Sequence, residues 1–477
     1  MDNKETQQKL LTRLIYKARE TNFGRQHHFE QINCYEDFSR QVPISFYKDI
    51  AGQIGKLKKG ASDILWPGRI DQFAVSAGTS GEGKHLPLSD QRLKSDRRFM
   101  RKIAVDYLQQ RPNFLDIIGT HLSLPGFLEK KEHFHIGEIS AFSAQHAPFW
   151  LTPLQFFNDD ELVNLPFSKK IERILDKATD TDVRVMTAAP NWILTIFQRL
   201  LEQTGKESIA EIWPNLKLLI CGGVKLDNYR SHILNLLGGI EVDFIETYGA
   251  SEGYIAFSDN LEKRDLKLIF DNGIFYEFIP HPLADQEAMS TQEAIPLWET
   301  QTDIPYAILV TTNAGLWRYA LNDVVEFRDT NPPRIEVRGR VSEMLDDYGE
   351  ALYAYEAAET LHKTAEELSI TIGNFTVGAQ MASSRQLPRH YWFIQTSESL
   401  SKDILLRFAG KLDTALQQEN RHYAIRRESE TMGEPKVLTI SQQQINTWLQ
   451  QKDKEKAQGK LPSILRDDSD IDFFKNS

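Results

Sequence analysis

The strongest constraint on the fold is the alternation of short apolar runs with helical spacing in the middle of the chain. Three short runs are predominantly apolar and are interpreted as buried strands: Val183–Met186, Leu216–Cys221 and Ile240–Ile245. Between the first two, Asn191–Gln203 has helical spacing and follows Pro190, which is favoured at a helix start. Strands that alternate with helices build a parallel sheet covered by helices, so we predict an α/β fold.

The regions before and after this core have different residue patterns. The first 70 residues read as helical, and a further helix is expected from Ser89 to Leu108. From Leu266 the pattern becomes antiparallel β, with Asn272-Gly273 predicting a tight hairpin between its flanking apolar runs. Residues 306–319 repeat the arrangement around a turn at 313–315. We therefore expect a β-barrel-like region beside the α/β layers.

The C-terminal part reads as a small α+β domain. The strand Arg334–Arg338 runs into Gly339-Arg340, where we place the boundary and a hinge at 339–343. Helices and strands are then expected in this order: helix 355–368, strands 375–381 and 390–396, helix 402–419, strand 437–440 and a last helix 442–450. The predicted organisation is a large N-terminal domain, 1–338, and a small mobile C-terminal domain, 339–477.

Composition excludes several classes of protein. The chain has 477 residues, and its 56 basic and 67 acidic side chains give a net charge of −11, which argues against nucleic-acid binding. Two cysteines cannot build a disulfide framework or a four-cysteine zinc site. The N-terminus lacks a signal-peptide pattern, and no apolar run is long enough to span a membrane. We expect a cytoplasmic monomer that binds no membrane.

The segment from Ser76 to Lys84 is rich in glycine and follows a short apolar strand. Backbone N–H groups of such a loop can surround phosphate oxygens, and the Lys84 ammonium adds a positive charge. The spacing fits a Walker A loop, but His85 replaces the hydroxyl residue needed for Mg²⁺, and Pro87 disfavours an immediate helix. We reject a P-loop NTPase; a phosphate-binding loop and an ordinary exposed loop both remain.

Other candidate residues lie beside predicted strands. After the run Ile240–Ile245, Tyr248 could cover a purine ring and Glu252 could hold Mg²⁺ beside phosphates. Asp323 follows a predicted strand and could accept both ribose hydroxyls. Arg340 at the boundary could contact ribose or phosphate. Each has a plainer alternative, namely a solvated turn for the two acids and an ordinary linker for Arg340.

The order of these pieces resembles the acyl-adenylate-forming superfamily of acyl-CoA synthetases and luciferases. The closer resemblance is to its Gretchen Hagen 3 (GH3) branch of acyl-acid amido synthetases. It covers essentially the whole chain and is carried by these stretches: Tyr35–Phe38 with Val42–Ile44, Leu65–Gly68, Ala74–Thr79, Ala189–Trp192, Thr247–Glu252, Phe275–Pro280 and Gly315–Tyr319.

The resemblance implies a site for ATP and Mg²⁺. Four residues of the glycine-rich loop would hold the β- and γ-phosphates: Ser76, Gly78, Thr79 and Ser80. Thr247 and Tyr248 would line the adenine and the α-phosphate, and Glu252 would hold Mg²⁺. Asp323 would bind the ribose hydroxyls, and Arg340 would approach from the hinge. Lys460 would act as the catalytic residue that bridges the acyl carboxylate and the α-phosphate.

The substrate-binding residues are less sharply defined. Candidate walls of the acyl-acid pocket are Thr120, Asn191, Trp192 and Ala250, although an apolar helix face is more often plain core. Three departures from the family pattern concern its loops. Ala320 stands in place of Arg, Asn322 in place of the Gly before the Asp, and Ser463 in place of the Arg after the lysine.

The implied function is an ATP-dependent ligase that activates a carboxylic acid as acyl-AMP and transfers the acyl group to an amino acid. Its partners would be a small carboxylic acid and an amino acid or another amine. Two alternatives stay open. One is an acid–thiol ligase that uses coenzyme A, and the other is a non-catalytic adenylate-binding protein.

Overall fold

The structure is a computed structural model that describes residues 2–76, 84–113, 115, 117–145, 154–156, 165, 167–223, 226–282, 286–345, 347–348, 350, 352–380, 387–396, 398–452 and 461–476. The chain forms two compact units, which we describe separately. Unit 1 comprises Met1–His281, Ser290–Leu321 and Val325–Val337. Unit 2 comprises Pro282–Met289, Asn322–Val324 and Arg338–Ser477. The bulk of unit 2 therefore begins beside Gly339, and two short pieces from earlier in the chain join it.

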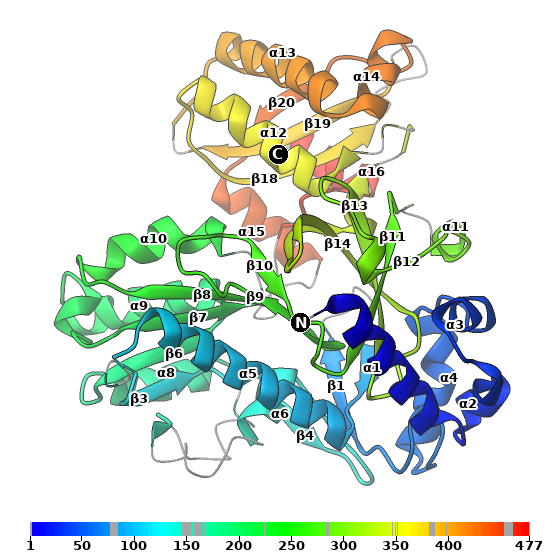
Figure 1. The fold of residues 1–477 in the computed structure, drawn as a ribbon. Coiled ribbons are helices and arrows are strands. Elements are labelled where there is room, and N and C mark those ends of the chain that lie inside the picture. The colour runs from blue at the N-terminus through cyan, green and yellow to red at the C-terminus, as the bar shows by residue number, and fades with distance from the viewer. Residues whose placement is uncertain are drawn as a thin grey trace. The chain divides into compact units, whose positions relative to one another are not determined.

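A sheet of eleven strands among the described residues runs through the large unit (Figure 1). In spatial order its strands are β12 (Ile295–Pro296), β11 (Ile274–Pro280), β13 (Pro305–Thr312), β14 (Tyr319–Thr330), β15 (Pro333–Arg340), β10 (Leu266–Leu268), β9 (Gly253–Phe257), β8 (Asp243–Ala250), β7 (Leu218–Gly222), β6 (Val183–Ala188) and β3 (Thr120–Ser123). The predicted antiparallel region is thus continuous with the α/β region in one sheet.

The parallel part of the sheet, β3-β6-β7-β8, is covered by helices on both faces. Leu218 and Ile220 pack with Phe99 of α5 (Asp90–Gln110). Leu219 and Cys221 point to the other face, towards the helices α8 (Phe167–Ala178), α9 (Pro190–Thr204) and α10 (Asp227–Leu237). Because β7 is buried on both faces, its residues Leu218–Cys221 are all apolar. The predicted α/β layers, the strand in 183–186 and the helix after Pro190 are confirmed.

The hairpin predicted at Asn272-Gly273 is wrong. β10 pairs with β9 and β15, whereas β11 pairs with β12 and β13. Gly273 has a positive φ of 84°, but Asn272 is outside that region, so the turn lacks the two positive φ angles of a tight hairpin. A Cβ on Gly273 would lie 2.4 Å from Asn313 Nδ2. Glycine is therefore needed at position 273 because the Asn313 side chain packs directly against its Cα. The turn at 313–315 does join neighbouring strands, β13 and β14.

The first 70 residues are helical, as predicted. Their helices are α1 (Asn3–Ala18), α2 (Asn22–Gln26), η1 (Phe29–Gln31), α3 (Tyr35–Gln41) and α4 (Tyr47–Lys58). A small sheet of order β2-β1-β5-β4 follows, built from β1 (Gln72–Ser76), β2 (Lys84–Pro87), β4 (Leu128–Lys130) and β5 (His135–Gly137). A strand rather than a helix begins at Lys84, in keeping with the rejection of a P-loop. Further short helices among the described residues of unit 1 are α6 (Ile139–Gln145), η4 (Ile209–Glu211) and η5 (Leu297–Glu299).

The Arg318 guanidinium joins the N-terminal helices to the antiparallel strands. Arg318 is 5% exposed, and its Nη1 donates to the carbonyl oxygens of Ser39 (2.6 Å) and Val42 (2.8 Å). Its Nε donates to Glu277 Oε1 at 3.0 Å, and Nη2 lies 2.9 Å from the same oxygen. Tyr35 Oη donates to Glu277 Oε1 as well (3.1 Å). This buried pair, with its hydrogen bonds satisfied, holds α3 against β11 and the start of β14.

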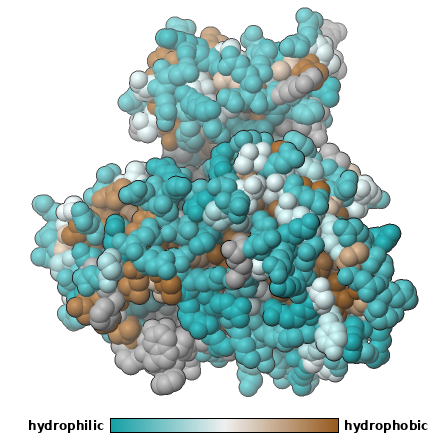
Figure 2. Space-filling view, viewed as in Figure 1, coloured by the Kyte–Doolittle hydropathy of each residue, from teal (hydrophilic) through white to brown (hydrophobic). Residues whose placement is uncertain are grey.

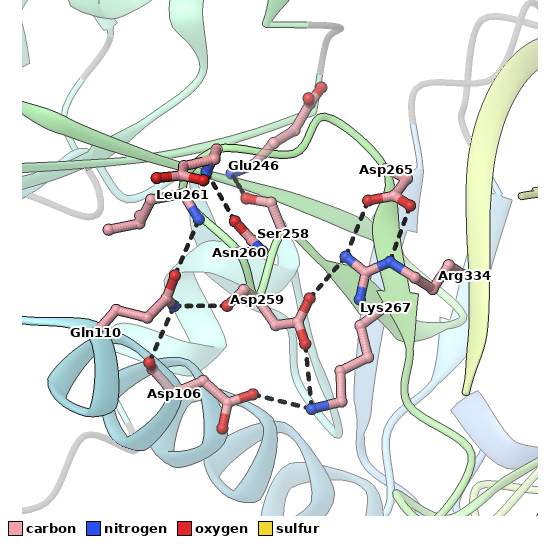
Figure 3. A network of polar contacts seen from close by, with 11 residues as sticks. Asp106, Gln110, Glu246, Ser258, Asp259, Asn260, Leu261, Asp265, Lys267 and Arg334 are labelled. Atoms are coloured by element: carbon pink, nitrogen blue, oxygen red, sulfur yellow. Dashed lines mark hydrogen bonds and ion pairs between the residues drawn. The ribbon is translucent and has the colours of Figure 1, made fainter. Parts of the chain in front are cut away.

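A second charged network fastens the C-terminal half of α5 to the sheet (Figure 3). Arg334 of β15 binds both oxygens of Asp265, at 2.8 and 2.9 Å, and its Nη2 lies 2.8 Å from Asp259 Oδ1. Lys267 Nζ bridges Asp106 of α5 (3.2 Å) and Asp259 (3.3 Å). The hydrogen bonds from Arg334 lower the pKa of Asp265. The network thus links the helix to two neighbouring strands.

Unit 2 contains a three-stranded sheet, β18-β19-β20, covered by helices. Its elements are α11 (Gln286–Ser290), η6 (Val341–Glu343), β16 (Met344–Leu345), β17 (Leu352–Tyr353), α12 (Ala354–Glu367), β18 (Ile372–Gln380), β19 (Arg389–Thr396), α13 (Lys402–Glu419), α14 (Arg421–Glu428), β20 (Lys436–Thr439), α15 (Gln442–Gln451) and α16 (Asp468–Asn476). The predicted α+β class and its strands are confirmed. α15 is not the last helix, because α16 follows and packs its Ile471 and Phe474 beside β19.

The length and apolar character of the helices test whether the chain could span a membrane. Within the described ranges, no helix has the length and apolar character needed to cross a membrane. The face drawn in Figure 2 is mostly hydrophilic, with hydrophobic residues in small groups.

We predict that Arg334→Gln destabilises the protein by about 2–3 kcal/mol, because the partly buried Asp265 carboxylate loses its charged donor and Asp259 keeps only Lys267. Chemical denaturation monitored by circular dichroism measures this loss. The pKa of Asp265 is lowered in the folded protein, so the pair stabilises the fold above the unfolded-state pKa of about 3.9. The difference between wild type and variant should shrink as the pH falls below that value.

The matched control is Arg328→Gln, whose guanidinium is 36% exposed and lies 2.6 Å from Glu336 and 3.7 Å from Asp303 and Glu326. It should cost at most about 1 kcal/mol. Equal losses for the two variants would contradict a special role of the Arg334 network.

Candidate active site

The β8–β9 hairpin carries four of the predicted site residues, namely Thr247, Tyr248, Ala250 and Glu252. Thr247 and Tyr248 lie inside β8 rather than after it, so the predicted position beyond the strand end is wrong for them. The strand outlasts its apolar run because β9 pairs with it through Ala250. Thr247 Oγ1 donates to the carbonyl oxygen of Cys221 at 3.0 Å. A Cβ on Gly222 would lie 2.6 Å from that hydroxyl, so glycine leaves the space that Thr247 needs.

Glu252 occupies the turn of this hairpin and is 8% exposed. Its carbonyl oxygen accepts a hydrogen bond from Arg92 Nη1, and Arg92 Nε donates to Asp96 Oδ1 at 2.9 Å. Arg92 and Asp96 lie one turn apart on α5 and are 1% and 3% exposed. Burial raises the pKa of Asp96, while Arg92 acts to lower it. The buried pair thus holds the main chain of the turn that presents Glu252.

Sequence reasoning missed Arg92 and Asp96. Oppositely charged residues spaced i, i+4 on a helix are common on exposed faces, and nothing local marks this pair as buried. Ser89 Oγ donates to the carbonyl oxygen of Asn313 at 2.5 Å, which fixes the start of α5 against the β13–β14 turn. This contact helps to position α5 so that Arg92 reaches the carbonyl oxygen of Glu252.

The strand that leads into the glycine-rich loop lies against the same turn. Ser251 Oγ donates to the carbonyl oxygen of Val75 at 3.4 Å, and Ser76 pairs with Lys84 across β1 and β2. The structure therefore brings both ends of the loop together and places β1 beside Glu252. The predicted phosphate-binding residues Gly78, Thr79 and Ser80 lie outside the described residues, as does the side chain of Ser76.

The start of β14 is held near these elements by the segment after α3. Ser45 N donates to the carbonyl oxygen of Arg318 (3.0 Å), and Ala320 N donates to that of Ser45 (2.9 Å), so Ser45 forms a parallel bridge with Tyr319. Two residues on, Tyr47 Oη accepts a hydrogen bond from His85 N of β2 at 3.1 Å.

Asp323 and Arg340 form an ion pair in unit 2, with Arg340 Nε 3.4 Å from Asp323 Oδ1. The prediction that Asp323 follows a strand is wrong, because β14 continues through it to Thr330. Asn322 before it has a φ of 71°. Asparagine tolerates this left-handed conformation better than most residues, which explains how it replaces the family's glycine. The side chain of Asp323 is 15% exposed and that of Arg340 is 56% exposed.

The four residues proposed for the acyl-acid pocket do not all come together. Asn191 and Trp192 begin α9, after the carboxyl end of β6. Thr120 pairs with Val183, at the amino end of that strand, so it lies at the opposite edge of the sheet from α9. Ala250 ends β8 opposite Gly253. On β3 it is Ser123, paired with Thr187, that lies near the carboxyl edge.

The predicted catalytic Lys460 lies outside the described residues. The segment after it is anchored in unit 2. Val377 N donates to the carbonyl oxygen of Ser463 (2.9 Å), and Leu465 N donates to that of Val377 (2.8 Å). This segment thus forms an isolated parallel bridge between Ile464 and Val377 of β18.

Comparisons with known proteins agree with this architecture. Three family models match: the GH3 family N-terminal domain over residues 1–170, the GH3 family central domain over 267–340 and the GH3 family C-terminal domain over 355–469. The chain is 21% identical to the indole-3-acetic acid-amido synthetase GH3.2 of Arabidopsis thaliana, over 87% of this chain and 89% of that protein.

Solved structures share the fold. The GH3.15 acyl acid amido synthetase superposes with a TM-score of 0.78 at 16% identity, covering 99% of this chain and 93% of the other. A 2-hydroxyisobutyryl-CoA ligase in its postadenylation state superposes with a TM-score of 0.61 at 12% identity, covering 100% and 92%. The three GH3 models together account for most of the sequence, and the chain belongs to the GH3 family.

Proposed function

We propose that this chain is an ATP-dependent acid–amino acid ligase. The observation that carries the proposal is the match over most of its length to a GH3 relative named an amido synthetase. The geometry supports it, because the ends of the glycine-rich loop and the buried Glu252 lie on adjoining elements of unit 1. The substrates would be a small carboxylic acid, ATP and an amino acid.

The first half of the reaction activates the acid. A carboxylate oxygen attacks the α-phosphorus of ATP, the bond to the β-phosphate oxygen breaks, and pyrophosphate leaves with its electron pair. Two anions must approach each other, so catalysis consists mainly of positioning and charge neutralisation. Main-chain N–H groups of the glycine-rich loop and the Lys460 ammonium would supply donors and positive charge.

Glu252 fits a magnesium ligand. Magnesium takes one or two carboxylates together with phosphate oxygens rather than a cage of protein ligands. Among the described residues there is no cluster of three or more histidine, cysteine or acidic side chains that could hold a metal ion. When bound, Mg²⁺ would neutralise charge on the phosphate oxygens. The hydrogen bond from Arg92 to the Glu252 carbonyl would keep the turn in place.

The second half forms the amide. The amine nitrogen attacks the acyl carbon, the bond to the AMP oxygen breaks, and AMP leaves while the nitrogen loses a proton. In unit 2, the Asp323 carboxylate would accept hydrogen bonds from the ribose hydroxyls. Arg340, which forms an ion pair with Asp323, would contact the ribose or a phosphate. We further propose that residues 339–343 form the hinge of a mobile C-terminal domain.

A coenzyme A ligase is the second candidate, because a CoA ligase shares the fold. Only the acceptor differs between the two reactions. We favour the amine acceptor because relatives that share most of the chain's length are named amido synthetases.

The decisive assay is ATP–pyrophosphate exchange across a panel of carboxylic acids, followed by trapping with amino acids or coenzyme A. We expect exchange with at least one acid and an amide product. Exchange with no acid would contradict the enzyme assignment. A thioester without any amide would establish the second candidate.

Lys460→Ala should reduce adenylation strongly, because the positive charge between the two anions is lost, while pre-formed acyl-AMP should still react with amine. Exchange and single-turnover aminolysis measure the two halves separately. Lys456→Ala, in the same lysine-rich run, is the control and should leave both unchanged. Wild-type exchange in the Lys460 variant would refute its role.

Asp323→Ala should weaken ATP binding by about 1.5–3 kcal/mol, the value of hydrogen bonds to a charged acceptor. Isothermal titration calorimetry measures it, and Asp329→Ala on the same strand is an exposed control. A parallel titration with 2′,3′-dideoxy-ATP should show no difference between Asp323→Ala and wild type. A difference there would mean that Asp323 acts otherwise than through the ribose hydroxyls.

A further inference from the structure

The large unit contains a cleft that is lined by none of the residues proposed for ATP or for the carboxylic acid. Its volume is about 560 Å³, and it lies between α3 with the following residues 41–44 on one side and residues 290–296, which include β12, on the other. All of its lining residues belong to unit 1. A cleft of this size accommodates a small organic ligand or a short piece of peptide. We call it the α3–β12 cleft.

The buried floor of the α3–β12 cleft has its charge compensated. Arg318 lines the cleft, is 5% exposed and forms its ion pair with Glu277. Tyr35 Oη donates to the carbonyl oxygen of Ala294 (2.9 Å) and to the Glu277 carboxylate. Burial and then the Glu277 carboxylate raise the pKa of Tyr35, so this hydroxyl stays protonated and neutral. The electrostatic character of the cleft is therefore set by its rim.

The rim of the cleft carries three exposed carboxylates, those of Glu36, Glu293 and Glu299. Among the described residues, no basic side chain forms an ion pair with any of the three. Arg40 also lines the rim, but its guanidinium is paired with Asp37 at 2.7 Å. Carboxylates gathered around a concave surface create a negative potential there, which attracts cations.

A hydrogen-bond acceptor of the cleft also lacks a partner. Gln41 lines the cleft, and its Oε1 is enclosed without a hydrogen-bond partner in the described ranges. An enclosed acceptor left unpaired costs free energy, so this one requires an explanation. The terminal torsion of a glutamine amide is broad and roughly two-fold, so the oxygen can turn towards the cleft. A ligand that carries several N–H groups would satisfy it.

The spacing of these groups selects among cations. Within the described part of the chain, no three histidine, cysteine or acidic side chains are grouped closely enough to hold a metal ion. The carboxylates and the amide instead line the cleft from different elements: α3, the segment after it, the residues before β12, and η5. A guanidinium presents five N–H donors in a planar fork, which suits acceptors that are spread around a cleft.

We propose that the α3–β12 cleft binds a ligand that carries a guanidinium group. Glu293 and Glu299 are its charge partners, and Gln41 is a hydrogen-bond acceptor for it. Two sources share this chemistry, namely a free small guanidine and the arginine side chain of a peptide segment. The site goes beyond the proposed ligase reaction and does not depend on it.

The test is isothermal titration calorimetry with three probes: agmatine, the peptide acetyl-Val-Arg-Val-amide, and the same peptide with citrulline in place of arginine. Citrulline keeps the shape of arginine but carries no charge. We expect at least one guanidinium probe to bind and the citrulline peptide to bind about tenfold more weakly than the arginine peptide if the peptide is bound. Tighter binding of the arginine peptide than of agmatine would identify a peptide segment as the source, and the reverse order a free guanidine.

The double variant Glu293→Gln/Glu299→Gln should reduce the affinity for the tighter probe about tenfold, because two partly exposed ion pairs with the ligand are lost. Its melting temperature should stay the same, since both carboxylates are exposed. The matched control is Glu202→Gln/Glu207→Gln, which removes the same charge from exposed positions in and after α9. The control should bind the probe as the wild type does.

Lack of binding by both guanidinium probes would overturn the proposal. Equal affinity for the arginine and citrulline peptides, unchanged affinity in the rim variant, or an equal loss in the control variant would also overturn it, because recognition would then not depend on the rim carboxylates. ATP–pyrophosphate exchange by the same protein is a separate readout, so any of these results would leave the proposed function standing.

Discussion

The architecture of the large unit depends on one buried ion pair, Arg318 with Glu277. Taking both charges out of water is costly, so the pair persists only because every strong donor has an acceptor. Those acceptors belong to different elements: the Glu277 carboxylate of β11 and the main chain at Ser39 and Val42. Removing either charge would leave the other buried and unpaired. The pair thus specifies where the N-terminal helices meet the sheet and where β14 begins.

Several stretches that carry the family resemblance meet at this joint. Tyr35–Phe38, Val42–Ile44, Phe275–Pro280 and Gly315–Tyr319 all contribute to it, and Trp317 Nε1 donates to the carbonyl oxygen of Leu65 (3.1 Å). These residues hold the N-terminal helices against the sheet, and β14, which carries Asp323, begins directly after Arg318. Helix α5 adds a second support, because the Arg334 network holds its C-terminal half and Ser89 its start.

Strands and helices with strong periodicity could be predicted, since burial on two faces dictates an apolar run and burial on one face dictates helical spacing. Which strands pair with each other in the sheet could not be predicted from the sequence. The Asn272-Gly273 pair has the composition of a hairpin turn, yet its flanking strands pair elsewhere because Gly273 meets Asn313, which lies far along the chain. Likewise, Asp323 reads as a turn residue but lies within a strand, because Asn322 absorbs the irregular φ.

By itself, the sequence determined the α/β class, the small α+β domain at the C-terminus and the membership suggested by its ordered motifs, because these follow from local pattern and residue type. Only the tertiary structure decided what lies beside Glu252. Arg92 comes from a helix far away in the chain, and no spacing rule connects it to the turn. Burial and hydrogen-bond satisfaction are properties of the packed molecule, so residue spacing in the sequence could not predict them.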